Sequence, residues 1–255
     1  MDFGLGVAQT AIGAALGFGL GLVGFHYQHK REREAAELAA QKAAVEALNR
    51  AVQSVAVNID TLVGIKRQVI KSLRPEAEAV QLALEKCTMA EPEQKEELAR
   101  RVLFLFKDSG QLYQSHPSIT AMALPDIKEF SLFNPDMPSL TTFMFLAMSQ
   151  MTELDARASS RNILISEFAR ESAGGMNEKR AFYFASMISS ESKAMCEAVD
   201  YSLGFCQLVM DQITDYMNAK HKDKPILQYF IRTDVITDLP DSKVFQSYQD
   251  QIVKF

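Results

Sequence analysis

The hydrophobic pattern begins with a long apolar run. From Phe3 to Phe25 no side chain is charged. About 20 apolar residues in a helix suffice to cross the ~30 Å hydrocarbon core of a bilayer. The pattern therefore predicts a transmembrane helix over residues 1–27. A cleaved secretory signal is the alternative, and it is disfavoured because no basic residue precedes the run and no convincing small-residue cleavage site follows it.

Small residues share one side of this predicted helix. With about 100° between successive residues, six of them fall within an arc of about 80°. These residues are Gly6, Thr10, Gly13, Gly17, Gly21 and Gly24. In lipid, a small-residue face lets helix backbones pack closely, as in GxxxG pairs. We expect self-association or docking on another membrane helix. The alternative is the general abundance of glycine in membrane helices.

The charges that flank the apolar run predict its orientation. Only Asp2 and the amino terminus precede it, whereas a membrane-proximal basic cluster of Lys30, Arg31 and Arg33 follows it. Basic residues next to a membrane helix favour the cytoplasmic side. We therefore expect a single-pass protein with its amino terminus outside and its carboxy-terminal domain in the cytoplasm, in a membrane such as the bacterial inner membrane.

A helical stalk is predicted over residues 28–74. Residues 31–73 contain no proline and a single glycine, and they are rich in strong helix formers. Apolar residues recur in two heptad series, which is typical of the a and d positions of a coiled coil. This stalk seam comprises Leu38, Val45, Leu48, Val52, Val55, Ile59, Leu62 and Val69. Pairing between chains, pairing within the chain and packing of an amphipathic helix on its own domain all fit this spacing.

Residues 75–255 are predicted to form a cytoplasmic helical domain. Arg74-Pro75 should end the stalk, because proline cannot continue the helical hydrogen-bond ladder. A short helix should follow to about Cys87, and a second helix from Pro92 to about Gln114. Four prolines punctuate residues 115–139, for which we expect an ordered apolar cap with a helical turn near 126–130.

Two long helices are predicted next, over residues 139–173 and 177–221. Ala173-Gly174-Gly175 separates them, which is typical of a helix stop and turn, so they should form an antiparallel hairpin. The expected apolar face of the first helix is Phe143, Leu146, Met151, Leu154, Ile163, Ile165 and Phe168. The tail after Pro225 should form a helix, a loop and a last short helix, or it docks on another chain.

Composition and motifs indicate little chemistry. The net charge is −5 and no basic block follows the membrane-proximal cluster, so nucleic-acid binding is not indicated. Cys87, Cys196 and Cys206 lie in apolar helical patterns and should be buried thiols. No nucleotide-binding, metal-binding or hydrolase motif is present. The charged residues of the first hairpin helix are interpreted as a solvated face: Glu153, Asp155, Arg157, Arg161, Glu167, Arg170 and Glu171. We predict no catalytic residue, metal or cofactor.

The sequence thus predicts an all-α protein. One transmembrane helix, a coiled-coil-like stalk and a cytoplasmic bundle with a long antiparallel hairpin follow each other along the chain. The expected function is that of a non-enzymatic, membrane-anchored, oligomeric accessory protein whose helical domain binds a cytoplasmic partner protein. The alternative is a membrane effector, for example in antiviral or abortive-infection defence, whose glycine-faced helices assemble into a pore. An enzyme that uses a carboxylate pair of the hairpin is a third, more distant hypothesis.

Overall fold

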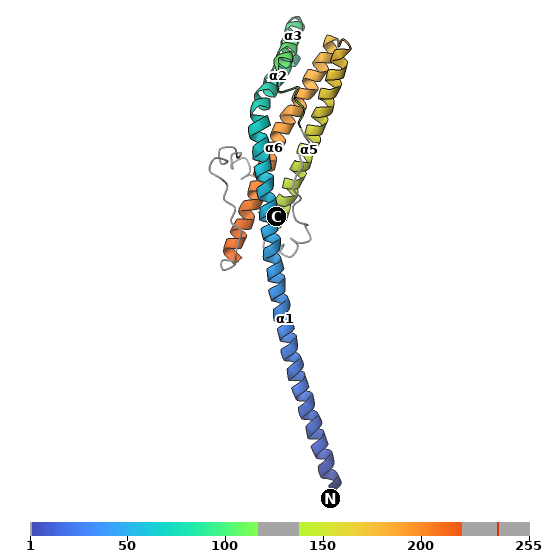
Figure 1. Ribbon diagram of the computed structural model, residues 1–255, viewed down its shortest axis with the longest axis vertical. Helices are drawn as coiled ribbons and strands as arrows, with labels where there is room; N and C mark the ends of the chain where they lie inside the picture. Colours follow the sequence, from blue (N-terminus) through green and yellow to red (C-terminus); the bar gives the residue numbers. More distant parts are fainter. Residues whose placement is uncertain (1, 117–137, 221–238, 240–255) are drawn as a thin grey trace. The chain divides into compact units, whose positions relative to one another are not determined.

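The computed structural model describes residues 2–116, 138–220 and 239, with side chains in residues 17–116, 139–219 and 239. Helices are the only regular secondary structure among these residues, which confirms the all-α class (Figure 1). In chain order the elements are α1 (Asp2–Ile65), a π-helical segment η1 (Lys66–Ile70), α2 (Lys71–Met89), α3 (Pro92–Asp108), α5 (Pro138–Ala173) and α6 (Glu178–Lys220). The chain divides into two compact units, Met1–Leu48 and Asn49–Phe255.

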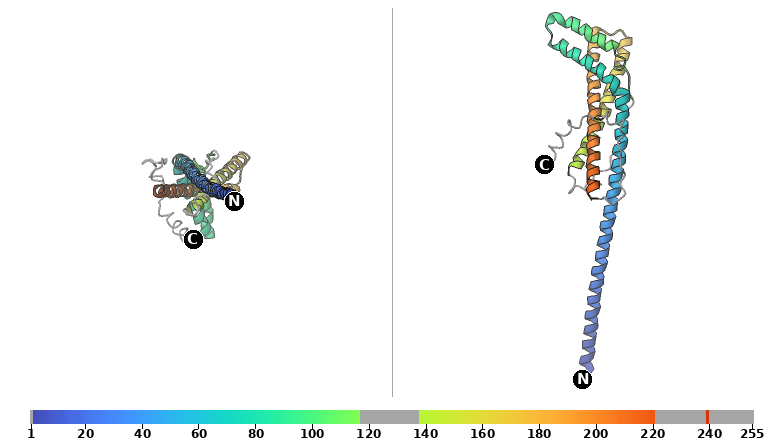
Figure 2. Two further views of the ribbon diagram at one scale, coloured as in Figure 1. Left: turned by 90° about the horizontal axis from the view of Figure 1, so that it is seen from below. Right: turned by 90° about the vertical axis from the view of Figure 1, so that its left-hand side faces the viewer.

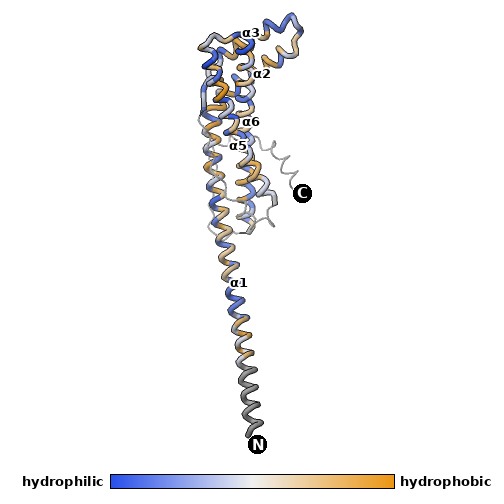
Figure 3. Tube along the Cα trace, turned by 90° about the vertical axis from the view of Figure 1, so that its right-hand side faces the viewer, coloured by the Kyte–Doolittle hydropathy of each residue, from blue (hydrophilic) through white to orange (hydrophobic). Residues whose placement is uncertain are grey.

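The long helical hairpin of the second unit is confirmed. Helices α5 and α6 pack along each other, and they are joined by a turn in which Gly175 adopts φ +86°, a backbone conformation that favours glycine. The amide of Gly174 donates to the carbonyl of Glu171, as expected where a helix ends. In Figure 3 hydrophobic and hydrophilic residues alternate along both helices, which is typical of helices with one buried face.

Helices α2 and α3 form a second hairpin, which packs on α6 (Figure 2). The predicted helix stop at Arg74-Pro75 is wrong, because α2 runs through Pro75 without a break. The irregularity lies one turn earlier, in the π-helical turn η1. A π turn is wider than an α turn and changes the angular position of the residues before it relative to those after it.

Helix α3 begins at Pro92 as predicted, but it ends at Asp108 and not near Gln114. Ser109 binds the last carbonyls of α3 in place of a further helical turn. Its amide donates to the carbonyl of Phe106 over 3.3 Å, and its hydroxyl donates to the carbonyl of Leu105 over 2.8 Å. The Tyr113 hydroxyl donates to Phe106 as well, over 2.6 Å. The last carbonyls of α3 are thereby satisfied outside the helix.

The core of the hairpin follows most of the predicted periodicity, although Leu146 and Phe168 of the expected face are only half-buried and one residue is exposed. Phe143, Met151, Leu154 and Ile165 are buried, as expected. Ile163 was expected in the apolar face but is 60% exposed, and its neighbour Leu164 is buried instead. The three cysteines are buried free thiols, which confirms their predicted position in the core.

Other predictions fall on residues that the structure leaves undescribed. The cap expected near 126–130 lies within residues 117–137, and the expected terminal helices lie within residues 221–255. The side chains of residues 1–16, in the predicted transmembrane helix, also lie outside the described part. Within the described residues, whose side chains begin at residue 17, no helix contains a segment long and apolar enough to cross a membrane.

Candidate functional site

The described part of the amino-terminal helix has an exposed apolar surface. Its large apolar side chains are 55–73% exposed: Phe18, Leu20, Leu22, Val23, Phe25 and Tyr27. A Cβ atom added to Gly17, Gly21 or Gly24 would meet no atom within 4 Å, so the predicted small-residue face is uncovered there. The other members of that face, Gly6, Thr10 and Gly13, lie outside the residues with described side chains.

The membrane-proximal basic cluster is partnered locally. Lys30 and Arg33 lie 4.0 and 3.8 Å from Glu34 and Glu37, one turn further along α1. The guanidinium of Arg31 lies over the ring of Tyr27, with 5.3 Å between its carbon and the ring centroid. All these charges are exposed, and such pairs contribute little to stability. They stay accessible to anionic groups.

The residues of the predicted stalk seam differ in exposure along the helix. Leu38 is 71% exposed, whereas Val45 and Leu48 are buried. Val69, in the π-helical turn, is half-buried. In the second unit four seam residues are buried within the single chain, namely Val52, Val55, Ile59 and Leu62. Figures 1 and 2 show this part of α1 alongside α6.

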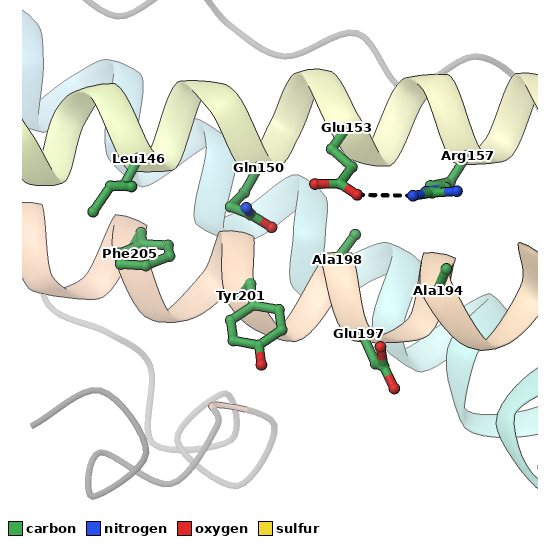
Figure 4. Close-up of a pocket in the computed structure, with 9 residues that line it drawn as sticks. All are labelled: Leu146, Gln150, Glu153, Arg157, Ala194, Glu197, Ala198, Tyr201 and Phe205. Atoms are coloured by element: carbon green, nitrogen blue, oxygen red, sulfur yellow. Dashed lines mark hydrogen bonds and ion pairs between the residues drawn. The ribbon is translucent and has the colours of Figure 1, made fainter. Parts of the chain in front are cut away.

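A shallow groove of about 330 Å³ runs between α5 and α6 (Figure 4). Two alanines of α6, Ala194 and Ala198, leave it hollow. Its polar walls carry Gln150, Glu153 and Arg157 from α5 and Glu197 and Tyr201 from α6. The guanidinium of Arg157 lies 3.2 Å from Glu153 and 3.3 Å from Glu191. The carboxylate of Glu153 is therefore held in an ion pair at this position.

A second groove of about 460 Å³ lies where α2, α3 and α6 meet. Its lining is apolar at Cys87, Ala99, Leu103 and Phe182, and its rim carries charges of both signs, from Lys95, Glu96, Arg100, Glu178 and Lys179. Nearby on α3, Phe104 is 67% exposed. Apolar surface with a polar rim is typical of protein interaction sites.

One carboxylate holds two cations at the π-helical turn. Asp200 of α6 accepts from Lys66 of η1 and from Arg74 of α2, and both distances are 2.6 Å. The same nitrogen of Arg74, Nη2, also donates to the carbonyl of Cys196 over 3.1 Å. Lys66 is the first residue of η1 and Arg74 lies in α2, so the two cations come from opposite ends of the π-helical turn and bind the same carboxylate. This cluster joins η1 and α2 to α6.

The most unusual side chain of the second unit is Arg161 of α5, which is fully buried. Its interpretation as part of a solvated face is wrong. The guanidinium donates to the carbonyls of Gln111, Leu112 and Gln114, over 2.8, 3.1 and 2.6 Å, and to Ser192 Oγ over 2.8 Å. Burial lowers the pKa of Arg161 to about 10, which leaves it charged at neutral pH.

Arg161 thereby fixes the segment of residues 109–116, which we call the strap. The next residue, Asn162, holds the end of the strap: its Nδ2 donates to the carbonyl of His116 over 2.6 Å, and its Oδ1 accepts from the amide of His116 over 3.0 Å. At the other end, the amide of Gln111 donates to Glu76 of α2 over 2.8 Å. Sequence reasoning missed this contact because Arg161 lies among ordinary surface charges, and only an adjacent apolar run from Ile163 to Ile165 indicates burial.

The strap contributes Tyr113 to an aromatic cluster with rings of α3, α5 and α6. Tyr113 stacks on Phe168 with 5.2 Å between ring centroids and contacts Phe106 at 5.0 Å, and Phe184 continues the cluster at 5.6 Å from Phe168. Arg180 covers Phe184 at 4.8 Å and pairs with both oxygens of Glu171 at 2.7 Å. Burial raises the pKa of Tyr113, so its hydroxyl stays protonated and continues to donate.

The buried thiols are expected to be unreactive. Burial raises the pKa of Cys196 to about 11 and that of Cys206 to about 12, so few thiolates form near neutral pH. No group of three or more metal-ligating side chains occurs among the residues that the structure describes.

Comparison of the chain with protein families, with curated proteins and with solved structures gives no match.

Proposed function

We propose that the chain is a non-enzymatic, membrane-anchored interaction protein. Its amino-terminal helix enters a membrane such as the bacterial inner membrane, and its helical domain binds a cytoplasmic partner protein. The observation that carries this proposal is the exposed apolar surface around Phe18, Leu20, Val23 and Phe25. Apolar surface left in water costs about 25 cal/mol per Å². A lipid phase or a second helix removes that penalty.

The uncharged run from Phe3 to Phe25 favours lipid as the main environment of this surface. The open positions at Gly17, Gly21 and Gly24 favour close packing of a second helix within the bilayer. We therefore propose that the protein assembles with copies of itself through this face, and that the stalk contributes where its seam is exposed, as at Leu38.

Vesicle flotation tests the membrane anchor. The full-length protein is expected to float with vesicles, and the double variant Leu20→Glu and Val23→Glu is expected to stay in the dense fraction. Leu82→Glu is the matched control, because Leu82 is an exposed apolar residue of α2 in the other unit. It is expected to float like the wild type. Flotation of the double variant at the wild-type level would refute the anchor.

The alternative proposal is a membrane effector, and the small-residue face supports it because tightly packed helices can assemble into a pore. Dye-filled vesicles separate the two proposals. The effector is expected to release dye when it assembles, whereas the accessory protein is expected to bind and leave the vesicles sealed. Sealed vesicles under every trigger tried would eliminate the effector.

The partner is expected on the second unit. Its apolar groove beside α3, with Leu103 and Phe182 in the lining and the exposed Phe104 nearby, supports this part of the proposal. Phe104→Asp places a charge on the exposed apolar surface of α3 without disturbing the core, and it is expected to abolish capture of a native partner while flotation stays unchanged. Unchanged capture would show that the partner does not bind at this groove.

A further inference from the structure

The strap is held by polar contacts that depend on charge. Its carbonyls at Gln111, Leu112 and Gln114 face the buried guanidinium of Arg161. Among the described residues no carboxylate pairs with Arg161, and the acceptors of its hydrogen bonds are these three backbone carbonyls and the hydroxyl of Ser192. Such a site tolerates a second positive charge poorly, because burial already disfavours the first one.

His116 brings a titratable group to this site. Asn162 holds the backbone of His116 at both its amide and its carbonyl. The Nε2 atom of the imidazole is buried and has no hydrogen-bond partner among the described residues. Buried polar atoms are nearly always satisfied, so an unpaired one at a charged site calls for an explanation.

We propose that the strap is a proton-operated latch: protonation of His116 next to the buried Arg161 releases residues 111–116 from the hairpin and uncovers the aromatic cluster below. The inference is independent of the amino-terminal helix and of membrane binding, since every residue in it belongs to the second unit.

The ionisable groups around the strap determine the sign of the effect. Arg161 faces His116 from α5, Cys196 lies near Arg161 on α6, Glu76 binds the far end of the strap from α2, and Tyr113 lies in the strap itself. Burial, and then the charge of Arg161, lower the pKa of His116 below its ordinary value of 6.5. The closed latch therefore favours neutral His116. The stabilisation of the closed latch by neutral His116 is fully present above the ordinary pKa of histidine. It is lost as the pH falls through the lowered pKa of His116.

Opening would create a new apolar surface. Tyr113 contacts Phe106 and Phe168, and Leu112 is fully buried in the closed strap. Removal of the strap would take Tyr113 away and expose the rings of Phe106 on α3 and Phe168 on α5. A surface of this kind suits an apolar helix of a partner protein.

Hydrogen exchange on the full-length protein in detergent tests the latch. We expect the amides of residues 111–116 to exchange several-fold faster at pH 5.5 than at pH 7.5 after correction for the intrinsic rates, with little change in the core of α5 and α6. His116→Gln is expected to abolish this pH dependence. His29→Gln, which removes an exposed histidine of α1, is the matched control and is expected to keep the full response.

Two results would overturn the latch. One is equal protection of the wild-type strap at both pH values, and the other is the same pH response in His116→Gln. If His116→Gln opens the strap at both pH values, the NMR titration of His116 in the wild-type protein decides. A midpoint below that of histidine in the unfolded chain supports the latch, and a midpoint at or above it refutes the latch.

Discussion

Arg161 and Ser192 join the two arms of the long hairpin: the guanidinium Nε of Arg161 on α5 donates to the hydroxyl of Ser192 on α6 over 2.8 Å. Both side chains are buried. The same hydroxyl donates to the carbonyl of Ile188 one turn earlier in α6, over 2.7 Å. Arg161 thus connects α5, α6 and the strap at one point, although its charge makes it an expensive residue to bury.

The first prediction concerns this connection. Arg161→Met keeps much of the apolar stem but leaves the carbonyls of Gln111, Leu112 and Gln114 without their donor. We expect a loss of roughly 3 kcal/mol in the free energy of unfolding, because each buried group left unsatisfied costs about 1–3 kcal/mol. Denaturant unfolding followed by circular dichroism in detergent measures it.

Arg157→Met is the control for this substitution. Arg157 lies one turn earlier on α5, is 40% exposed and pairs with Glu153 and Glu191. Exposed ion pairs contribute about 0–1 kcal/mol, so the control is expected to unfold nearly like the wild type. Equal losses in the two variants would mean that burial of Arg161 does not contribute to stability.

The contrast between Arg161 and Arg157 shows where sequence reasoning reaches its limit. Hairpin helices and their glycine turn could be predicted, because periodicity and turn chemistry are local properties of the sequence. The burial of Arg161 could not, since its acceptors are carbonyls of the strap, 47 to 50 residues away along the chain. Ile163 and Leu164 show the same limit, because a small rotation of a helix decides which of two adjacent apolar residues faces the core.

A second prediction concerns the two cations at the π-helical turn. Asp200→Asn removes the charge that holds Lys66 and Arg74, and both cations are then left half-buried next to a neutral amide. Hydrogen bonds between charged groups contribute about 1.5–3 kcal/mol. We expect a loss of about 2 kcal/mol in the free energy of unfolding and faster amide exchange in η1.

Glu197→Gln is the control on the same helix, since Glu197 is exposed and has no ion pair among the described residues. Little change is expected from it. If Asp200→Asn leaves the exchange of η1 unaltered, the cluster does not stabilise the π-helical turn.

A third prediction concerns Pro75, which lies inside α2 although proline normally ends a helix. Its side chain is exposed, so Pro75→Ala removes no core contact. Alanine restores the missing amide donor toward the carbonyl of Lys71, and it is favoured over proline in a helix interior by about 3 kcal/mol. Because proline also restricts the unfolded chain, the expected net gain is about 1–2 kcal/mol. A lower midpoint of denaturation would show that α2 requires the proline.

The last prediction concerns the small-residue face of the amino-terminal helix. Gly17→Leu and Gly21→Leu each place a bulky side chain in an open position of that face. If two helices pack closely there, the added side chain forces their backbones apart, and the oligomer is expected to shrink or dissociate while membrane binding stays intact.

Gly19→Leu is a matched control, because Gly19 is equally open but lies on the opposite side of the helix, about 160° from both Gly17 and Gly21. Mass measurement of the detergent-solubilised full-length protein distinguishes the variants. A loss of assembly in all three would indicate a general effect of bulk, whereas a loss confined to Gly17→Leu and Gly21→Leu would identify the small-residue face as the interface.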